Sequence, residues 1–258
     1  MKSEISYIFN GIKGIEAQGK NESLSLSLDI FKKALNLTNQ NMEVLKNVAP
    51  DLFEILGLRN LSSFVGEMFV SSLFKSADGL LAKNPHQDGY PDLLLMTKEG
   101  SELWNKLISN NQDKRPFSGF ETGGIEIKAT CGSVPSPDFF KKKNLRKPEI
   151  GDERINYVRG YDWKAHHRET NNLLGIYWDF INEKPIICGV FFCKELSELD
   201  WGKIVQPKEG GGRTTSVSIM TREGVYKMYS NWIAVIDDKR YMDFFNRFNK
   251  SQLIGPAA

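Results

Sequence analysis

One short strand organises this sequence, and it reads Gly123-Gly124-Ile125-Glu126-Ile127-Lys128-Ala129-Thr130. Apolar residues alternate here with two opposite charges, which is the period-2 pattern of a strand. The apolar members are expected to pack on a core, whereas Glu126 and Lys128 share the opposite face. The plainest interpretation of the charges is a surface ion pair on an edge strand, which contributes little to stability.

A second signal lies upstream, where Pro91-Asp92 opens an apolar run. The segment Pro91 to Thr97 predicts a first core strand, and proline suits a strand start because its missing N–H is harmless there. A carboxylate entering one strand, beside a carboxylate and an ammonium on the next, can gather a divalent cation and a positive charge around one phosphate. The two strands therefore outline a site for phosphodiester hydrolysis.

Pro91-Asp92 and Glu126-Ile127-Lys128 resemble the motif of the PD-(D/E)XK nuclease superfamily, and the resemblance covers only these residues and their strand context. It implies an α/β fold, with a restriction-endonuclease-like mixed central sheet flanked by helices. It also implies that Asp92, Glu126 and the main-chain carbonyl of Ile127 hold Mg²⁺, for which Mn²⁺ can substitute. Lys128 would orient or deprotonate the attacking water, and as a base it would need a pKa below that of a free ammonium.

Glu67 is the sole charge in the apolar segment Ser62 to Phe74, which predicts a helix with Ser62 and Ser63 as cap residues. A lone carboxylate is expensive to bury unless something pairs with it. In the superfamily that this sequence resembles, a helix before the first catalytic strand often presents a glutamate to the metal site, and Glu67 occupies the matching place. The alternative is a carboxylate on a narrow solvent face near Lys75.

Residues Ser3 to Gly57 predict an N-terminal helical subregion, because apolar residues such as Ile5, Ile8 and Phe9 recur at helical spacing. The expected division is residues 1–59 for this subregion and 60–258 for a nuclease core with DNA-recognition insertions, within one compact domain. The helices could serve dimerisation or DNA clasping, or simply pack beside the sheet.

The remaining core is expected from three apolar segments. Leu173 to Ile181 and Pro185 to Cys193 flank a short polar turn and predict a hairpin that supplies the third and fourth strands. Trp232 to Asp237 predicts a buried strand, and Lys239 to Phe248 a terminal helix. Cys131, Cys188 and Cys193 lack metal-ligand spacing, and the last two lie in an apolar strand, where thiols behave as small hydrophobes.

Candidate DNA contacts lie in three polar segments that follow the Glu126 strand. Residues 141–147 form the densest positive run and suit backbone phosphates, whereas residues 161–171 and 213–218 carry side chains suited to base edges. The candidates are Lys141, Lys142, Lys143, Lys164, His166, His167, Arg168, Arg213, Thr214, Thr215 and Ser216. Two alternatives stay open: core hydrogen bonding for the histidines, and a plain surface loop for residues 213–216.

Charge and hydropathy limit the partners. The formal net charge is only +2, so contact with nucleic acid would have to come from local patches. No window approaches 18 consecutive apolar residues, and Met1-Lys2-Ser3-Glu4 does not begin a signal peptide. A cytoplasmic protein without membrane contact is expected.

The resemblance and the chain length favour a type II restriction endonuclease, which is a Mg²⁺-dependent hydrolase of double-stranded DNA at a specific short sequence. Palindromic sites then imply a homodimer, and a cognate DNA methyltransferase in the same cell. The alternatives are a structure-selective or repair endonuclease of the same fold, similar to a resolvase, and a DNA-binding module that does not cleave.

Overall fold

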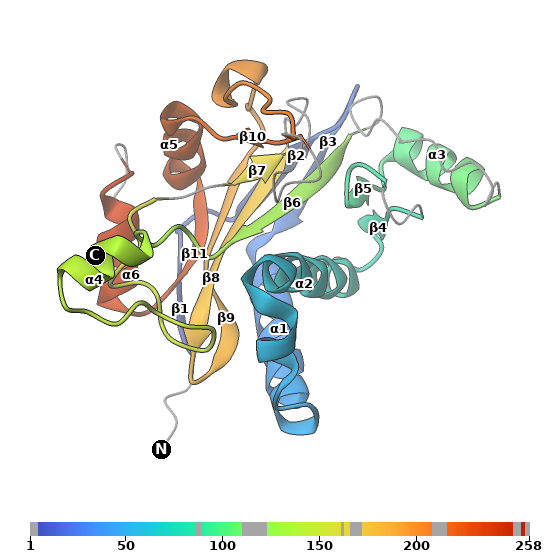
Figure 1. Cartoon of the computed structure of the whole chain (residues 1–258). Helices are drawn as coiled ribbons and strands as arrows, with labels where there is room; N and C mark the ends of the chain where they lie inside the picture. Colours follow the sequence, from blue (N-terminus) through green and yellow to red (C-terminus); the bar gives the residue numbers. More distant parts are fainter. Residues whose placement is uncertain are drawn as a thin grey trace.

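A seven-stranded mixed sheet forms the centre of the computed structural model, which describes residues 5–85, 89–109, 123–160, 163–165, 172–207, 216–249 and 254–255 (Figure 1). Its strand order is β1-β11-β9-β8-β6-β5-β4. The strands are β1 (Tyr7–Phe9), β4 (Leu81–Lys83), β5 (Leu93–Leu95), β6 (Gly124–Thr130), β8 (Leu173–Ile181), β9 (Lys184–Cys193) and β11 (Trp232–Ile236). Two small sheets pair β2 (Gly14–Gln18) with β3 (Ser23–Ser27), and β7 (Lys164–Ala165) with β10 (Ser218–Ile219).

The helices are α1 (Leu28–Val48), α2 (Leu52–Ser76), α3 (Lys98–Ile108), α4 (Pro137–Lys142), α5 (Arg222–Ser230) and α6 (Lys239–Asn246), with a short 3₁₀ helix at Glu198–Asp200. Within α2, Gly57 has φ 63° and ψ 161°, a conformation that is essentially restricted to glycine. Gly57, the sixth residue of α2, therefore kinks the helix near its start. The predicted terminal helix at residues 239–248 is confirmed as α6.

The sheet is mixed because one of its strand pairs is parallel. Strands β4, β5 and β6 pair antiparallel, β6 and β8 run parallel, and β8 and β9 form an antiparallel hairpin. Parallel neighbours need a long crossover, which the segment between Thr130 and Leu173 supplies. The predicted hairpin is thus confirmed, and its turn residues Asn182 and Glu183 have φ 54° and 60°, as a two-residue turn with positive φ requires.

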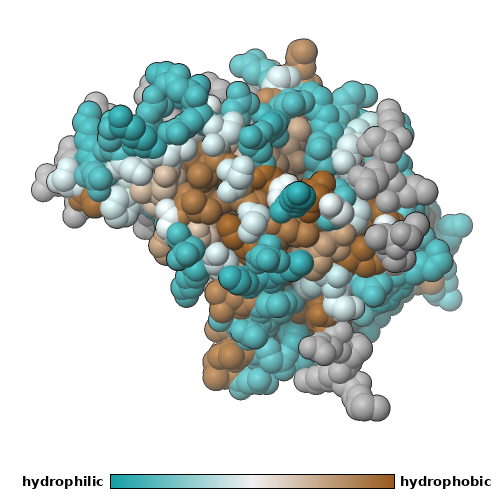
Figure 2. Space-filling model, turned by 180° about the vertical axis from the view of Figure 1, so that it is seen from behind, coloured by the Kyte–Doolittle hydropathy of each residue, from teal (hydrophilic) through white to brown (hydrophobic). Residues whose placement is uncertain are grey.

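Apolar cores lie on both faces of the sheet. Along β8, Trp178 and Phe180 pack with α1 and α2, whereas Tyr177 packs with α6. A strand buried on both faces reads as a continuous apolar run, and this is the composition of β8 and β9. Seen from behind, apolar residues gather toward the middle of the surface and hydrophilic ones surround them (Figure 2).

The helix predicted over the first part of the chain is wrong for Tyr7 to Ser27, which form β1, β2 and β3. β1 pairs with β11 at the sheet edge, and β2 and β3 form a hairpin. The alternation Ser23-Leu24-Ser25-Leu26-Ser27 has period 2, with Leu26 fully buried. Helical spacing among the earlier isoleucines was coincidental because three-residue and five-residue strands carry too few apolar positions to fix a period.

Three other predictions need correction at their boundaries. The apolar helix around Glu67 belongs to α2, so Ser62 is not a cap; its hydroxyl donates to Leu58 O at 3.1 Å and accepts from Trp178 Nε1 at 3.2 Å. The strand after Asp92 is shorter than predicted, and β4 precedes it. Counted from the β4 edge, the hairpin strands β8 and β9 are therefore the fourth and fifth strands of the sheet, not the third and fourth.

No helix among the described residues is long and apolar enough to cross a membrane.

Candidate active site

The pairing of β5 with β6 brings Asp92 to Glu126. Leu93 pairs with Ile125 in an antiparallel register, so the residue before Leu93 lies across from the residue after Ile125. A Cβ added to Gly124 would lie 2.0 Å from Pro91 Cγ and 2.8 Å from Leu93 O. Glycine at this position therefore permits the close approach of the two strands that carries Asp92 to the site.

Backbone geometry fixes the Asp92 carboxylate on β6. Ile127 N donates to Asp92 Oδ2 at 2.7 Å. The preceding amide, Glu126 N, donates to Asn172 O at 3.1 Å on the β8 side. Successive residues of a strand direct their backbone groups to opposite edges, so the N–H and C=O of Ile127 both face the Asp92 edge. The predicted third ligand oxygen is thus on the same edge as the first carboxylate.

Glu126 and Lys128 share one face of β6, as the alternation predicts, and Lys128 Nζ donates to Glu126 Oε1. Glu126 is nevertheless only 3% exposed, so the interpretation as a surface ion pair is wrong. Its second oxygen, Oε2, is buried and finds no hydrogen-bond partner in the described part of the chain. A buried carboxylate oxygen without a donor is costly, which makes this atom a position for a further positive group.

The electrostatics follow from two carboxylates that share one ammonium. Burial raises the pKa of Asp92 to about 7, and the Glu126 charge adds to the rise, while Lys128 and the Ile127 N–H oppose it. Burial lowers the pKa of Lys128, but Glu126 and Asp92 outweigh burial and leave it above its ordinary value. In the metal-free chain the pKa of Lys128 thus lies above its ordinary value, opposite to the fall that a Lys128 base would need, and Lys128 is a positive charge beside the two carboxylates.

Helix α2 places Glu67 near the same edge. A Cβ added to Gly66 would lie 3.7 Å from Ala129 Cβ, so this part of α2 packs directly on β6. Glu67 is exposed, as the solvent-face alternative expects. Its charge still contributes to the raised pKa of Asp92, which brings it within electrostatic range of the site.

The donor set of the site suits a hard divalent cation. Among the residues that the structure describes, no three His, Cys, Asp or Glu side chains gather closely enough to hold a metal ion. The predicted set differs, because it combines two carboxylates with a main-chain carbonyl. Glu126 Oε2 is buried without a hydrogen-bond partner among the described residues, and burial together with the Glu126 charge raises the pKa of Asp92; oxygen-preferring Mg²⁺ would relieve both costs.

The candidate DNA contacts fall into three groups. Lys141, Lys142 and Lys143 are exposed at α4, which lies at the opposite end of the molecule from β5 (Figure 1). Lys164 is exposed on β7, and Ser216 is half-buried before β10. The others lie outside the described residues: His166, His167, Arg168, Arg213, Thr214 and Thr215.

Strand β7 lies on the face of the sheet that carries Lys128. Gly175 is the β8 partner of Lys128, and a Cβ added to Gly175 would lie 2.7 Å from the ring of Trp163. Because directly paired residues present the same face, Trp163 and the adjacent Lys164 belong to the Lys128 side. Of the described basic candidates, the structure thus brings Lys164 toward the site and leaves the α4 lysines apart from it.

Asn172 positions β6, and the sequence analysis missed it. Its amide nitrogen donates to Gln18 O at 2.6 Å and Gly124 O at 3.1 Å, and its side-chain oxygen accepts from Gln18 N at 3.0 Å. Only its place directly before an apolar strand could have suggested a structural role.

Comparison of this chain with protein-family models, with curated proteins and with solved structures finds no match. The functional assignment therefore rests on the geometry of the site.

Proposed function

We propose that this chain is a Mg²⁺-dependent endodeoxyribonuclease of the PD-(D/E)XK type, and more narrowly a type II restriction endonuclease that cuts double-stranded DNA at a specific short sequence. The observation that carries the proposal is the Asp92 carboxylate bound to Ile127 N at 2.7 Å, beside the buried Glu126–Lys128 pair. These residues lie on neighbouring strands of the sheet, and the helix that carries Glu67 packs on one of those strands. This arrangement supports a restriction-endonuclease-like core.

Each residue has a role that its surroundings suit. Asp92, Glu126 and the carbonyl of Ile127 would hold Mg²⁺ or Mn²⁺ with hard oxygen ligands. When bound, the cation stabilises negative charge on the phosphate and lowers the pKa of bound water. Lys128, kept positively charged by Glu126, would orient the attacking water and attract the phosphate. Glu67 would add an outer carboxylate that holds a water or a second ion.

The proposed setting follows from the chemistry of restriction. A palindromic site is read most simply by a homodimer with one active site for each strand. A cytoplasmic enzyme of this kind requires a cognate DNA methyltransferase that protects the host sites. Lys164 would help to bind the duplex because it lies on the Lys128 side of the sheet, and the unplaced candidates at residues 166–168 and 213–215 would read base edges.

Plasmid cleavage tests the proposal. Supercoiled DNA incubated with the chain and Mg²⁺ should give discrete bands, and chelator should prevent cleavage. Asp92→Ala should be inactive, whereas Asp243→Ala, which alters an exposed helix carboxylate, should cut normally. Cleavage confined to branched DNA would favour the resolvase-like alternative. Duplex binding without cleavage under any of these metal conditions would favour the non-cleaving module.

A further inference from the structure

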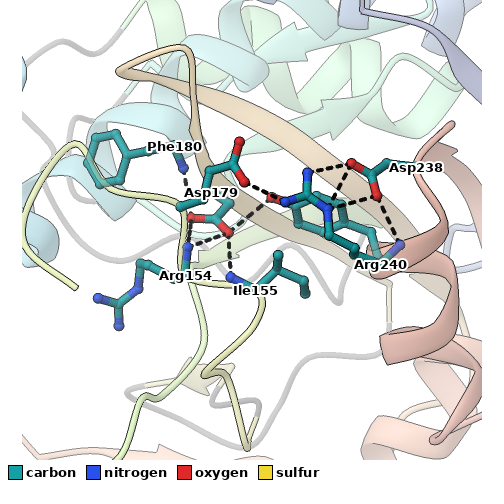
Figure 3. Close-up of polar contacts among 8 residues, drawn as sticks. Arg154, Ile155, Asp179, Phe180, Asp238 and Arg240 are labelled. Carbon is teal, nitrogen blue, oxygen red and sulfur yellow. Dashed lines mark hydrogen bonds and ion pairs between the residues drawn. The ribbon is translucent and has the colours of Figure 1, made fainter. Parts of the chain in front are cut away.

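A second site is indicated by Arg154, whose backbone and side chain have different partners. Its backbone N donates to both oxygens of Asp179, at 3.0 Å and 2.9 Å. The side chain turns away from that carboxylate (Figure 3). Arg154 is 4% exposed, its Nε has no hydrogen-bond partner in the described structure, and Nη2 makes a single contact of 3.4 Å with Gly132 O.

Asp179 does not satisfy this guanidinium. Its carboxylate already accepts from the backbone N of Arg154, Ile155 and Phe180 and from the hydroxyl of Tyr241. These bonds occupy the acceptor positions of a carboxylate. A buried cation in this position is therefore unfavourable unless an anion joins it.

A cavity of about 770 Å³ adjoins Arg154. It lies between the start of α2, with Glu54 and Leu58, and the segment that follows α4; its wall also includes Val134 and residues 146–150. Such a volume is typical of small-molecule sites. Gly66 and Glu67, which mark the candidate active site, lie on the later part of α2, so this cavity is separate from that site.

The charges on the wall define what the cavity can bind. Arg146 is already paired with Glu149 at 2.9 Å and Asp152 at 3.2 Å. Lys147 and Arg154 remain as positive groups that can meet a ligand, and both line the cavity. A guanidinium fork matches the oxygens of a phosphate, and an ammonium adds a point charge. Glu54 would accept a hydrogen bond from a hydroxyl or amine that the phosphate carries.

We propose that this cavity binds a phosphate group, with Arg154 as the principal donor and Lys147 as the second positive charge. The cavity is larger than a lone phosphate, so the group is carried either by a small molecule or by a nucleic-acid strand. This site does not depend on the proposed cleavage function, because no residue of the Asp92 site contributes to it.

Titration of the full chain with inorganic phosphate tests the site, with chloride at matched ionic strength as the reference and the shift in thermal midpoint as the readout. Arg154→Met should weaken phosphate binding about tenfold or more, as expected for loss of a charge-assisted hydrogen bond. Lys147→Met should weaken it by a smaller factor. Arg159→Met is the matched control: Arg159 is exposed in the same segment and stacks on Phe139 at 4.0 Å, so phosphate affinity should not change.

Stability separates a binding residue from a structural one. In chloride alone, Arg154→Met should be at least as stable as the parent chain, because an apolar side chain replaces a buried guanidinium whose Nε has no hydrogen-bond partner among the described residues. No stabilisation of the parent chain by phosphate beyond chloride would overturn the proposal. An Arg154→Met variant that loses stability but keeps the parent's phosphate affinity would also overturn it.

Competition identifies the source of the phosphate. If free phosphate displaces a short DNA duplex, and Arg154→Met weakens binding of that duplex, the group belongs to a nucleic-acid strand. If phosphate binds but duplex affinity responds neither to phosphate nor to Arg154→Met, the group belongs to a small molecule. Both results support the site. Because neither measurement involves cleavage, an inactive chain would leave the outcome readable.

Discussion

Replacing Asp92 with asparagine should stabilise the metal-free chain at neutral and alkaline pH while abolishing cleavage. The carboxyl group has a pKa of about 7 in the folded chain, raised from 3.8, mainly because it is buried beside Glu126. Asparagine keeps a side-chain oxygen that can accept from Ile127 N, so the 2.7 Å hydrogen bond that fixes the side chain on β6 can persist. The substitution therefore removes the charge and spares the geometry.

The sign and size follow from linkage. Between pH 3.8 and about 7 the unfolded chain releases the Asp92 proton while the folded chain keeps it, so the free energy of unfolding falls as pH rises through this window. About three pH units at 1.36 kcal/mol each give a deficit on the order of 4 kcal/mol above pH 7. The attraction of Lys128 is already contained in that shift, because it opposes the rise. The deficit corresponds to roughly 8–16 °C in thermal midpoint for a chain of this size.

Urea unfolding in chelator, followed by tryptophan fluorescence, measures the effect. The stability advantage of Asp92→Asn over the parent chain should widen by about 3 kcal/mol between pH 5 and pH 8. For Asp243→Asn, which changes an exposed carboxylate, the difference should not widen. Mg²⁺ should then stabilise the parent chain more than Asp92→Asn at pH 8. A pH-independent difference, or an Asp92→Asn chain that is the less stable at pH 8, would refute the argument.

Three further outcomes are expected. Glu126→Ala and Lys128→Ala should eliminate plasmid cleavage in Mg²⁺ while keeping duplex binding in Ca²⁺, which a mobility-shift assay would show; cleavage at the parental rate by either would contradict the site. Lys164→Ala should weaken duplex binding and reduce its salt dependence by about one counterion, whereas Lys142→Ala at α4 should have less effect in anisotropy titrations. Asp179→Ala should lower the free energy of unfolding by about 3–5 kcal/mol in urea titrations, because the hydrogen-bond donors around this buried carboxylate would lose their acceptor. A loss under 1 kcal/mol would show that those donors find other partners.

The sequence predicted the elements in which periodicity and length agree. β8, β9 and β11 are apolar runs long enough to exclude a solvent-facing position, and polar turn residues separate β8 from β9. The N-terminal strands could not be predicted in this way. β1 spans only three residues and is stabilised by pairing with β11, which lies far along the chain. Tertiary pairing of this kind overrides local spacing.

The residues of the candidate site could be predicted from the sequence, but their burial could not. Alternation along β6 places Glu126 beside Lys128 whatever the strand packs against, so that contact follows from the sequence alone. Burial depends on the neighbours of the strand, and nothing near residue 126 in the sequence indicates that Asn172 and β8 close over this edge. Burial lowers the pKa of Lys128, as expected, but Glu126 and Asp92 together raise it by more, so its direction in the metal-free chain is upward.

Asp179 and Glu67 show why one sequence feature has two outcomes. Each is a single carboxylate in an apolar segment, and burying either would be costly without partners. Asp179 lies on a central strand buried on both faces, so the fold supplies donors from the segment at Arg154 and from α6. Glu67 lies on a helix with one face open to solvent, so it needs no such donors and remains available to the active-site edge. Whether such a carboxylate is buried with donors or left exposed depends on whether its element lies in the central sheet or on the outside of it. A carboxylate that lies beside other carboxylates and has no donors dedicated to it is the better candidate for function.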